Sequence, residues 1–399
     1  MNRETLVKFR DFATLNPGQS PKSEFYSNSE GLPFLQGNRT FGLLYPKIDT
    51  YTTKTTKIAE KGEILMSVRA PVGDLNFAKE KVCIGRGIAG INAKDGNNKF
   101  LFYCLKYNIK NLIKQSGGTT YNSVNKDIIN DFDLIMPRTT LERKVVAKIL
   151  SDLDSKIELN NKINSELEAM AKLIYDYWFV QFDFPDENGK PFKSSGGKMV
   201  YNEELKREIP EGWEIASLLE IADFTNGIAC QKYRPNSEEE AYRVIKIREM
   251  GDGFTDKSEL VSRSIPDKVI VNDGDILFSW SATLDVKIWT GGIGGLNQHI
   301  FRVTSEDYPR TFYYFEVLRY LEYFKMVADL RKTTMGHITR DHLKQSRISI
   351  PPSFLIERIH EKIDPILNKI VKSSQENLKL AELRDWLLPM LMNGQVSVN

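Results

Sequence analysis

Long apolar runs, a cysteine framework and an excess of one charge sign are all missing from this sequence of 399 residues. No apolar run approaches the roughly 18 residues of a membrane-spanning helix, so we expect no membrane span. Residues 1–16 contain no apolar core, which argues against a signal peptide. The three cysteines lie far apart and outside any CxxC pattern, so neither a zinc site nor a disulfide framework is expected. These absences favour a protein of the reducing cytoplasm.

Neither charge sign dominates, because 55 Lys and Arg residues stand against 53 Asp and Glu residues, for a net charge of +2. A protein that coats nucleic acid by charge alone would carry a basic excess. The balance is still compatible with DNA binding through local clusters of cations. With 41% hydrophobic and 27% charged residues, the composition is that of a globular protein and excludes an intrinsically disordered chain.

Catalytic motifs are missing as well. There is no Gly-x4-Gly-Lys-[Ser/Thr] loop for an ATPase and no HExxH pair among the four histidines. The Asn/Asp-Pro-Pro-Tyr/Phe tetrapeptide of amino-methyltransferases is also missing. Two Pro-Asp segments, at Pro185 and Pro266, fit a nuclease pattern only loosely. We therefore expect no catalytic residues, no cofactor and no metal site in this chain.

The most informative feature is an internal repeat. The segment Lys61–Leu65 (KGEIL) recurs as Asp273–Leu277 (DGDIL), and Leu141–Arg143 (LER) recurs as Ile356–Arg358 (IER). Further matches keep the same order, with an offset that drifts by only a few residues. A period this long is not that of a solenoid. The chain is therefore predicted to be a duplicated module.

Each module begins with a part that mixes strands and helices. Residues 63–68 and 275–280 follow glycine turns and predict strands. Residues 100–113 and 312–330 carry apolar and aromatic side chains at helical spacing. Residues 131–136 and 346–350 predict closing strands, which end at Pro137 and Pro351. This part of each module is expected to be α+β.

The second part of each module is one long helix of about 40 residues with an apolar seam at heptad spacing. Because neither helix can hide its seam alone, we expect an antiparallel coiled coil. The seam residues are Val146, Ile149, Leu153, Asn160, Ile163, Leu167, Met170 and Ile174 in the first helix and Ile359, Ile363, Ile366, Ile370, Asn377, Leu380 and Leu387 in the second. The polar members either fix the register of the pair or are simply solvated.

The predicted fold class is therefore α+β, with two α/β domains in a pseudo-two-fold tandem repeat, separated by two long antiparallel coiled-coil helices. We expect the first domain at residues 1–138 and its helix at 139–181. A linker with flexible Ser and Gly residues follows at 182–212. The second domain is expected at 213–351 and its helix at 352–394. Aromatic residues such as Tyr175, Trp178 and Trp386 favour a partner on the helices, or they fill the junction between helix and domain.

Three surfaces recur in the two modules and could contact DNA. The first is a Gly- and Thr-rich loop, whose small and hydroxyl-bearing residues suit phosphate or base contacts; an ordinary capped loop is the alternative. The candidates in the first module are Gln36, Arg39, Arg69, Arg86, Gly117, Gly118, Thr119, Thr120, Tyr121 and Lys126. Those in the second module are Lys232, Arg234, Lys246, Arg248, Trp280, Lys287, Gln298, Lys332, Thr333, Thr334, His337 and Arg340. The loops differ between the copies, as two readers of different sequences would.

At this point the residues resemble a known family, the specificity subunits of type I restriction–modification systems. The resemblance covers essentially the whole chain. It is carried by the repeated KGEIL and DGDIL runs, the Gly-Thr-Thr and Thr-Thr-Met-Gly loops, and the helix openings after Pro137 and Pro351. The segments at 175–179 (YDYWF), 182–185 (FDFP) and 210–213 (PEGW) add to it. One departure is that no Trp opens the first module as Trp213 opens the second.

The resemblance implies a non-catalytic subunit. Two target-recognition domains would each read half of a split double-stranded DNA target. The paired helices would set the gap and dock two methyltransferase subunits, and restriction subunits would join the full complex. The alternatives are a stand-alone or decoy DNA-binding protein, and a coiled-coil adaptor without sequence preference. The recognised bases do not follow from the sequence, because the geometry of the loops decides them.

Overall fold

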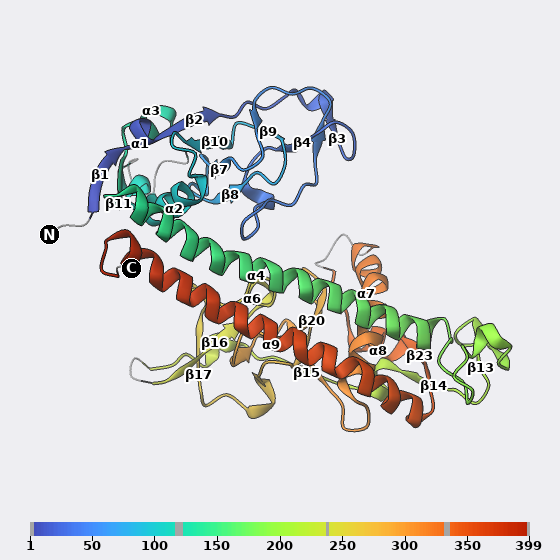
Figure 1. Cartoon of the computed structure of the whole chain (residues 1–399). Helices are drawn as coiled ribbons and strands as arrows, with labels where there is room; N and C mark the ends of the chain where they lie inside the picture. Colours follow the sequence, from blue (N-terminus) through green and yellow to red (C-terminus); the bar gives the residue numbers. More distant parts are fainter. Residues whose placement is uncertain (1–3, 116–122, 237–238, 331–335, 397–399) are drawn as a thin grey trace. The chain divides into compact units, whose positions relative to one another are not determined.

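The computed structural model describes residues 4–115, 123–236, 239–330 and 336–396. The chain divides into two compact units (Figure 1). Unit 1 comprises Met1–Glu158 and Lys379–Asn399, and unit 2 comprises Leu159–Leu378. Each unit therefore contains one α/β domain and a part of each long helix.

The domain of unit 1 is organised around a four-stranded antiparallel sheet. Its strands, in spatial order, are β2 (Ala13–Pro17), β10 (Ile88–Ala93), β7 (Ile64–Ser67) and β8 (Leu75–Phe77). Successive side chains of a strand point to opposite faces. Accordingly, Ile64 and Met66 join one core, whereas Leu65 joins another. This central sheet is thus buried on both faces.

One face of the sheet packs against helices, chiefly α2 (Asn98–Gln115), with α1 (Phe9–Phe12) and α3 (Lys126–Asp131) in the same core. A short pair, β1 (Glu4–Lys8) with β11 (Asp133–Pro137), closes the domain. The other face packs against a second sheet. Its strands, in order, are β3 (Tyr26–Ser27), β5 (Tyr51–Thr52), β4 (Leu32–Leu35), β9 (Val82–Ile84) and β6 (Ile58–Ala59).

Unit 2 repeats this topology. Its central sheet has the order β15 (Asp223–Asn226), β22 (Ile300–Thr304), β19 (Ile276–Ser279) and β20 (Asp285–Ile288). Its second sheet has the order β17 (Leu260–Ser262), β16 (Ala241–Ile245), β21 (Gly294–Leu296) and β18 (Ile270–Val271). The closing pair is β14 (Glu214–Ser217) with β23 (Arg347–Ile350), and the helices are α5 (Leu218–Ile221), α6 (Ile247–Asp252), α7 (Arg310–Leu330) and α8 (Arg340–Gln345). The predicted duplication is confirmed: the central sheets match in strand order, and β17, β16, β21 and β18 correspond to β5, β4, β9 and β6, whereas β3 has no counterpart in the second sheet of unit 2 as described.

The long helices are α4 (Thr140–Tyr175), which ends in a π-helical turn at Asp176–Val180, and α9 (Ser353–Met392). Each begins just after the proline that ends the closing strand. Thr139 and Glu142 form a capping box at the start of α4: the Glu142 carboxylate accepts from the Thr139 amide at 2.9 Å, and the Thr139 hydroxyl accepts from the Glu142 amide at 3.2 Å. The sequence therefore specifies where α4 starts.

The two helices contact one another in antiparallel register within each unit. In unit 1, Asp154 pairs with Arg384 at 2.6 Å. In unit 2, the Asn160 amide donates to Asn377 at 2.9 Å, and the Asn164 amide donates to Ser374 at 3.1 Å. Polar side chains thus line the contact between the helices.

Two of the predicted seam residues lie elsewhere. Ile163 and Met170 are 39% and 44% exposed. Asn164 and Ala171, one residue further along, are buried in their place. The heptad pattern predicted apolar residues at these positions, but the residues buried there are a small one, Ala171, and a hydrogen-bonded one, Asn164. Val146, Asn160, Ile359, Ile363 and Ile370 are buried as well, whereas Ile149, Leu153, Leu167, Ile174, Ile366, Asn377, Leu380 and Leu387 are half-buried.

The segment between the modules, residues 182–212, is ordered rather than an open linker. It contains the hairpin β12 (Met199–Asn202) and β13 (Arg207–Pro210). Phe182 and Phe184 are buried against Trp213, with ring centroids 5.2 and 5.6 Å away. Tyr175 and Trp178 are also buried, so they fill the junction between helix and domain, whereas Trp386 is exposed. No helix within the described ranges is long and apolar enough to cross a membrane.

Candidate nucleic-acid interface

In unit 1, four predicted DNA-contacting residues come together around one hollow. The hollow has a volume of about 370 Å³ and is bordered by the end of β4, the turn after β7 and the turn between β9 and β10. The predicted residues that line it are Gln36, Arg39, Arg69 and Arg86. Residues separated by up to 50 positions in the sequence thus present three guanidinium groups at one place.

These guanidinium groups differ in their surroundings. Arg39 pairs with Asp49 at 2.6 Å, and this hydrogen bond holds the pKa of the Asp49 carboxyl below its ordinary value. Arg69 and Arg86 are exposed, and neither forms an ion pair with any residue that the structure describes. A guanidinium that is not neutralised internally is available for a phosphate or a base.

In unit 2, three of the predicted residues, Trp280, Gln298 and His337, also lie together, but here aromatic rings rather than guanidinium groups meet. The Trp280 ring lies 5.7 Å from the ring of His299 and 6.2 Å from that of His337. Its indole N–H donates to Asn226 at 3.1 Å. The side-chain amide of Gln298 lies 3.3 Å from His299 Nε2. Trp280, Gln298 and His337 therefore share one surface.

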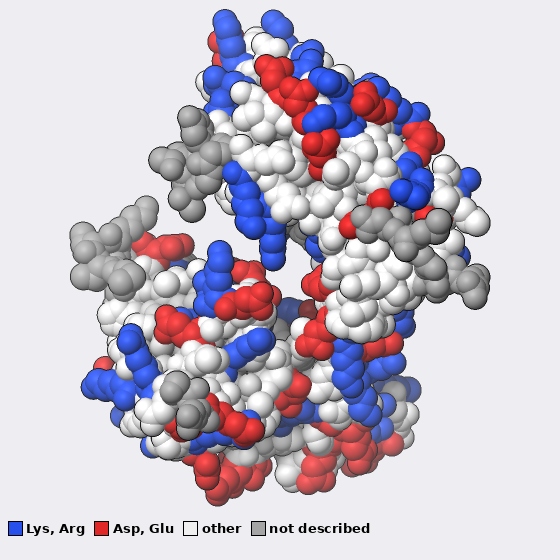
Figure 2. All heavy atoms as spheres, turned by 90° about the vertical axis from the view of Figure 1, so that its left-hand side faces the viewer, with Lys and Arg blue, Asp and Glu red and all other residues white. Residues whose placement is uncertain are grey.

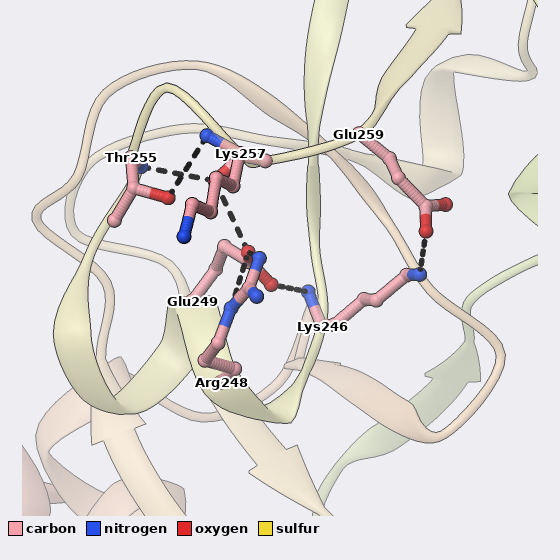
Figure 3. Close-up of polar contacts among 7 residues, drawn as sticks. Lys246, Arg248, Glu249, Thr255, Lys257 and Glu259 are labelled. Atoms are coloured by element: carbon pink, nitrogen blue, oxygen red, sulfur yellow. Dashed lines mark hydrogen bonds and ion pairs between the residues drawn. The ribbon is translucent and has the colours of Figure 1, made fainter. Parts of the chain in front are cut away.

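Lys246 and Arg248, also predicted to contact DNA, are held by carboxylates (Figure 3). Lys246 pairs with Glu259 at 2.5 Å, and Arg248 pairs with Glu249. The Glu249 side chain is only 1% exposed. Burial opposes its ionisation, but hydrogen bonds from Arg248 and Ser258 outweigh burial and hold the pKa of Glu249 below its ordinary value.

The loop beside this ion pair completes the arrangement (Figure 3). The Ser258 hydroxyl donates to Glu249 at 3.0 Å and accepts from the Thr255 amide at 3.0 Å. The charge of Glu249 is therefore satisfied from two directions. Since both cations are already paired, a contact between DNA and Arg248 would have to compete with Glu249.

Other predicted residues lie apart from these groups. Lys287 lies near Asp285, at 3.7 Å, and lines a separate cavity of about 500 Å³ between β20, α4 and α7. The Lys287 ammonium lies 3.4 Å from the Met250 carbonyl, to which it donates, and no contact joins it to the Trp280 group among the described residues. Lys126 and Arg340 are the exposed first residues of α3 and α8, at equivalent places in the repeat. Lys232 and Arg234 are exposed near β17.

Several predicted residues fall outside the described ranges. These are Gly117, Gly118, Thr119, Thr120, Tyr121, Lys332, Thr333 and Thr334. The described residues at the ends of these loops take equivalent positions. The Val124 amide donates to the Val68 carbonyl at 2.9 Å, and the Ile338 amide donates to the Trp280 carbonyl at 2.8 Å.

The surface charge matches the near-neutral composition. On the face drawn in Figure 2, basic and acidic residues are interspersed, and neither sign forms a continuous patch. Across the residues with described positions, no group of three His, Cys, Asp or Glu side chains could hold a metal ion. Contacts to DNA would therefore depend on particular side chains rather than on bulk charge.

Sequence reasoning missed two members of the surface around Trp280, namely Asn226 and His299. Ser281 is bridged to His337 in the backbone and lies 3.3 Å from His299 Nδ1. His299 follows Gln298 in the turn between β21 and β22. Alignment of this turn with the Gly85–Ile88 turn of the first repeat would have indicated it.

Comparisons with known proteins identify the architecture. A family model described as a type I restriction modification DNA specificity domain matches residues 4–169 and again residues 210–381. The specificity subunit of the type I restriction enzyme MjaIX from Methanocaldococcus jannaschii is 27% identical over 354 residues, which cover 86% of this chain and 79% of that protein. The specificity subunit of HindI from Haemophilus influenzae is 25% identical over 342 residues, which cover 71% and 73%.

A solved structure has the same fold. The crystal structure of the S subunit of a type I restriction-modification system from M. genitalium superposes with a TM-score of 0.58. The superposition covers 100% of this chain and 97% of that one, at 16% sequence identity. At this level of identity the likeness concerns the fold alone.

Proposed function

Since the chain belongs to the family of type I restriction–modification DNA specificity proteins, we propose that each of its repeats reads one half of a split double-stranded DNA target. The first recognition domain would span residues 1–138 and the second residues 213–351. The helices at 139–181 and 352–394 would separate them, and the ordered segment 182–212 would connect the modules. The chain itself would be non-catalytic and need no cofactor.

One observation carries this proposal. The two repeats share the strand order of the central sheet and the turn geometry, yet they place different side chains at equivalent surface positions. Guanidinium groups gather in unit 1, at Arg69 and Arg86. An indole and imidazoles gather in unit 2, at Trp280, His299 and His337. A shared scaffold with different contact groups suits two readers of two different half-sites.

Methylation of adenine would come from two methyltransferase subunits that dock on the helices, and restriction subunits would join that core. An apolar stripe on α4 supports such docking. At about 100° per residue, its members fall within about 80° of one another around the helix. They are Leu159, Ile163, Met170 and Leu173, all exposed, and exposed Tyr177 follows in the π-helical turn. Exposed Glu166 interrupts the stripe between Ile163 and Met170, and the exposed apolar residues on either side of it suit a protein–protein contact.

The helices would also set the gap between the half-sites. A helix of 36 residues rises about 54 Å at 1.5 Å per residue, and one turn of DNA is about 34 Å. Helices of this length are therefore sufficient to separate two recognition domains by about one turn, with unread bases between.

Modification sequencing of DNA tests the proposal. DNA would be compared from cells with and without this chain, with its methyltransferase partner present in both. We expect a split motif with methylated adenine on both strands, which is lost without the chain. Exchange of residues 1–137 for those of a related subunit should change one half of the motif only. No chain-dependent motif, or a change in both halves, would overturn the proposal.

A further inference from the structure

A turn in front of β10, and in front of its counterpart β22, places one side chain at the same position in both repeats; Arg86 is exposed and Gln298 is half-buried. In unit 1 this is the turn from β9 to β10, where the Ile88 amide donates to the Gly85 carbonyl at 3.0 Å. In unit 2 it is the turn from β21 to β22, where the Ile300 amide donates to the Asn297 carbonyl at 3.1 Å. Arg86 and Gln298 are thus the second residues of matching turns.

Further backbone hydrogen bonds fix this equivalence. The carbonyl of the third turn residue accepts from the amide of the residue that directly follows β7 or β19. The Gly87 carbonyl accepts from the Val68 amide at 2.9 Å, and the His299 carbonyl accepts from the Trp280 amide at 3.3 Å. The amide of the first turn residue donates to a carbonyl of the neighbouring strand in the second sheet. The Gly85 amide donates to the Leu35 carbonyl of β4 at 2.8 Å, and the Asn297 amide donates to the Ile245 carbonyl of β16 at 3.1 Å. The backbone therefore presents residue 86 and residue 298 in the same way.

The chemistry offered at this position differs. The Arg86 guanidinium is exposed beside Arg69, and its own backbone amide is held by the Ser20 hydroxyl at 3.2 Å. It offers hydrogen-bond donors only. In unit 2, Ser281 takes the place of Arg69: Arg69 is bridged to Ser123 in the backbone, and Ser281 is bridged to His337. The Gln298 amide offers both donors and an acceptor.

The major-groove edges of the two purines differ in the same respect. Guanine presents two acceptors, N7 and O6, which suit the two parallel donors of an arginine. Adenine presents the acceptor N7 beside the donor N6–H₂, which suits an amide. We infer that Arg86 reads a guanine in the half-site of the first domain and that Gln298 reads an adenine in the half-site of the second. This inference rests on the proposed function.

Reciprocal variants in the complex with the methyltransferase subunits test this inference. Methylation motifs would be compared for the wild type, Arg86→Gln and Gln298→Arg. We expect Arg86→Gln to lose the preference for guanine at one position of the first half-site, by roughly 5- to 100-fold in methylation of the G-containing over the A-containing site, with the second half unchanged. Gln298→Arg should shift one position of the second half-site from adenine toward guanine.

Two further variants separate base reading from other effects. Arg86→Lys keeps the charge but loses the bidentate geometry, so it should relax the guanine preference while overall methylation is retained. Arg138→Gln removes an exposed guanidinium of the same unit outside the hollow and should leave the motif intact. Because Arg86 and Arg138 are exposed and Gln298 is only half-buried, the melting temperatures of the variants should match that of the wild type.

The outcomes are distinguishable. If the wild-type complex has no chain-dependent split motif, the proposed function fails, and this inference fails with it. If the motif is present but Arg86→Gln lowers methylation equally at all sites, Arg86 contacts phosphate and the inference is wrong. An unchanged motif in both reciprocal variants would also overturn it.

Discussion

Removal of the Arg384 guanidinium should open unit 1 locally. Arg384 lies on α9 and pairs with Asp154 on α4 at 2.6 Å. The side chains are 7% and 2% exposed. The second oxygen of Asp154 accepts from the Tyr103 hydroxyl on α2 at 2.6 Å. This buried cluster ties both long helices to the domain of unit 1.

The magnitude follows from the burial of the carboxylate. In Arg384→Met, Asp154 keeps the hydrogen bond from Tyr103 but loses its counter-charge. An uncompensated buried charge costs about 3–5 kcal/mol. Methionine keeps much of the side-chain volume and favours helix, so packing and propensity add little. Surface ion pairs contribute only about 0–1 kcal/mol. Lys148→Ala, which breaks the exposed pair with Asp152 on α4, is therefore a matched control.

Hydrogen exchange of the α2 amides suits this measurement better than a global melt, since the chain has two units and need not unfold in one step. If the free energy of opening falls by about 3–5 kcal/mol, the α2 amides that exchange through unfolding should exchange faster by about two to nearly four orders of magnitude, at about 1.36 kcal/mol per factor of ten. Lys148→Ala should change it by less than about fivefold. If Arg384→Met changes exchange no more than this control, the reasoning about the buried charge is refuted.

The same cluster predicts a recovery. A triple variant with Tyr103→Phe, Asp154→Leu and Arg384→Met replaces the three buried members by apolar side chains of similar size and leaves exposed Asp385, which accepts from Arg384 at 2.8 Å in the wild type. Replacement of a whole buried ion pair is often neutral or stabilising. We expect its exchange rates to return to within about tenfold of the wild type. Rates as fast as those of the single variant would mean that shape, rather than charge, explains the loss.

Three other predictions follow from the helices and from Glu249. Addition of four residues after Asn160 and four after Asn377 lengthens the helix pair by about 6 Å, so modification sequencing should find a longer gap between unchanged half-sites. Leu173→Glu, at a position that is 66% exposed, should weaken co-purification of the methyltransferase subunit, while the melting temperature stays the same. Because the pKa of Glu249 is lowered in the fold, its stabilising effect is present above its ordinary pKa and is lost as the pH falls through the lowered value. In Glu249→Gln, the free energy of unfolding of unit 2, measured by circular dichroism, should therefore fall less steeply as the pH is lowered in the acid range.

The sequence was sufficient to predict the duplication and most of its elements. Strands expected at 63–68 and 275–280 are β7 and β19, and helices expected at 100–113 and 312–330 lie within α2 and α7. These elements are buried on one or both faces, so their apolar periodicity is strong. In these four elements the apolar periodicity of the sequence coincides with the faces that are buried in the fold, so the sequence predicted them correctly.

The contact between the long helices was harder to predict. Hydrophobic periodicity selected Ile163 and Met170, but Asn164 and Ala171 are buried instead. Asn164 is accepted in the contact because Ser374 lies opposite it on α9. A heptad pattern read from one helix contains no information about the partner residue that accepts a hydrogen bond from a buried amide nitrogen. Burial of polar residues therefore depends on pairing that only the structure reveals.

The sequence predicted single residues of the candidate interface, but it did not predict which of them the fold brings together. Arg86 joins Arg69 in the hollow of unit 1, whereas Arg248, chosen on the same grounds, is paired with buried Glu249. Charge in the sequence does not distinguish an available cation from a neutralised one. The distinction comes from which carboxylate the fold brings near.

The turns that present Arg86 and Gln298 are held by backbone hydrogen bonds, and in unit 1 also by the Ser20 hydroxyl, which accepts from the Arg86 amide, so the chain can change what it reads without changing these turns. The hydrogen bonds between Gly85 and Ile88 and between Asn297 and Ile300 do not involve the side chains of Arg86 and Gln298. A substitution there should alter the free energy of unfolding by no more than about 0.5 kcal/mol. Base preference can then vary at nearly constant stability. The buried cluster of Asp154 and Arg384 has no such freedom, because one change leaves a charge without its partner.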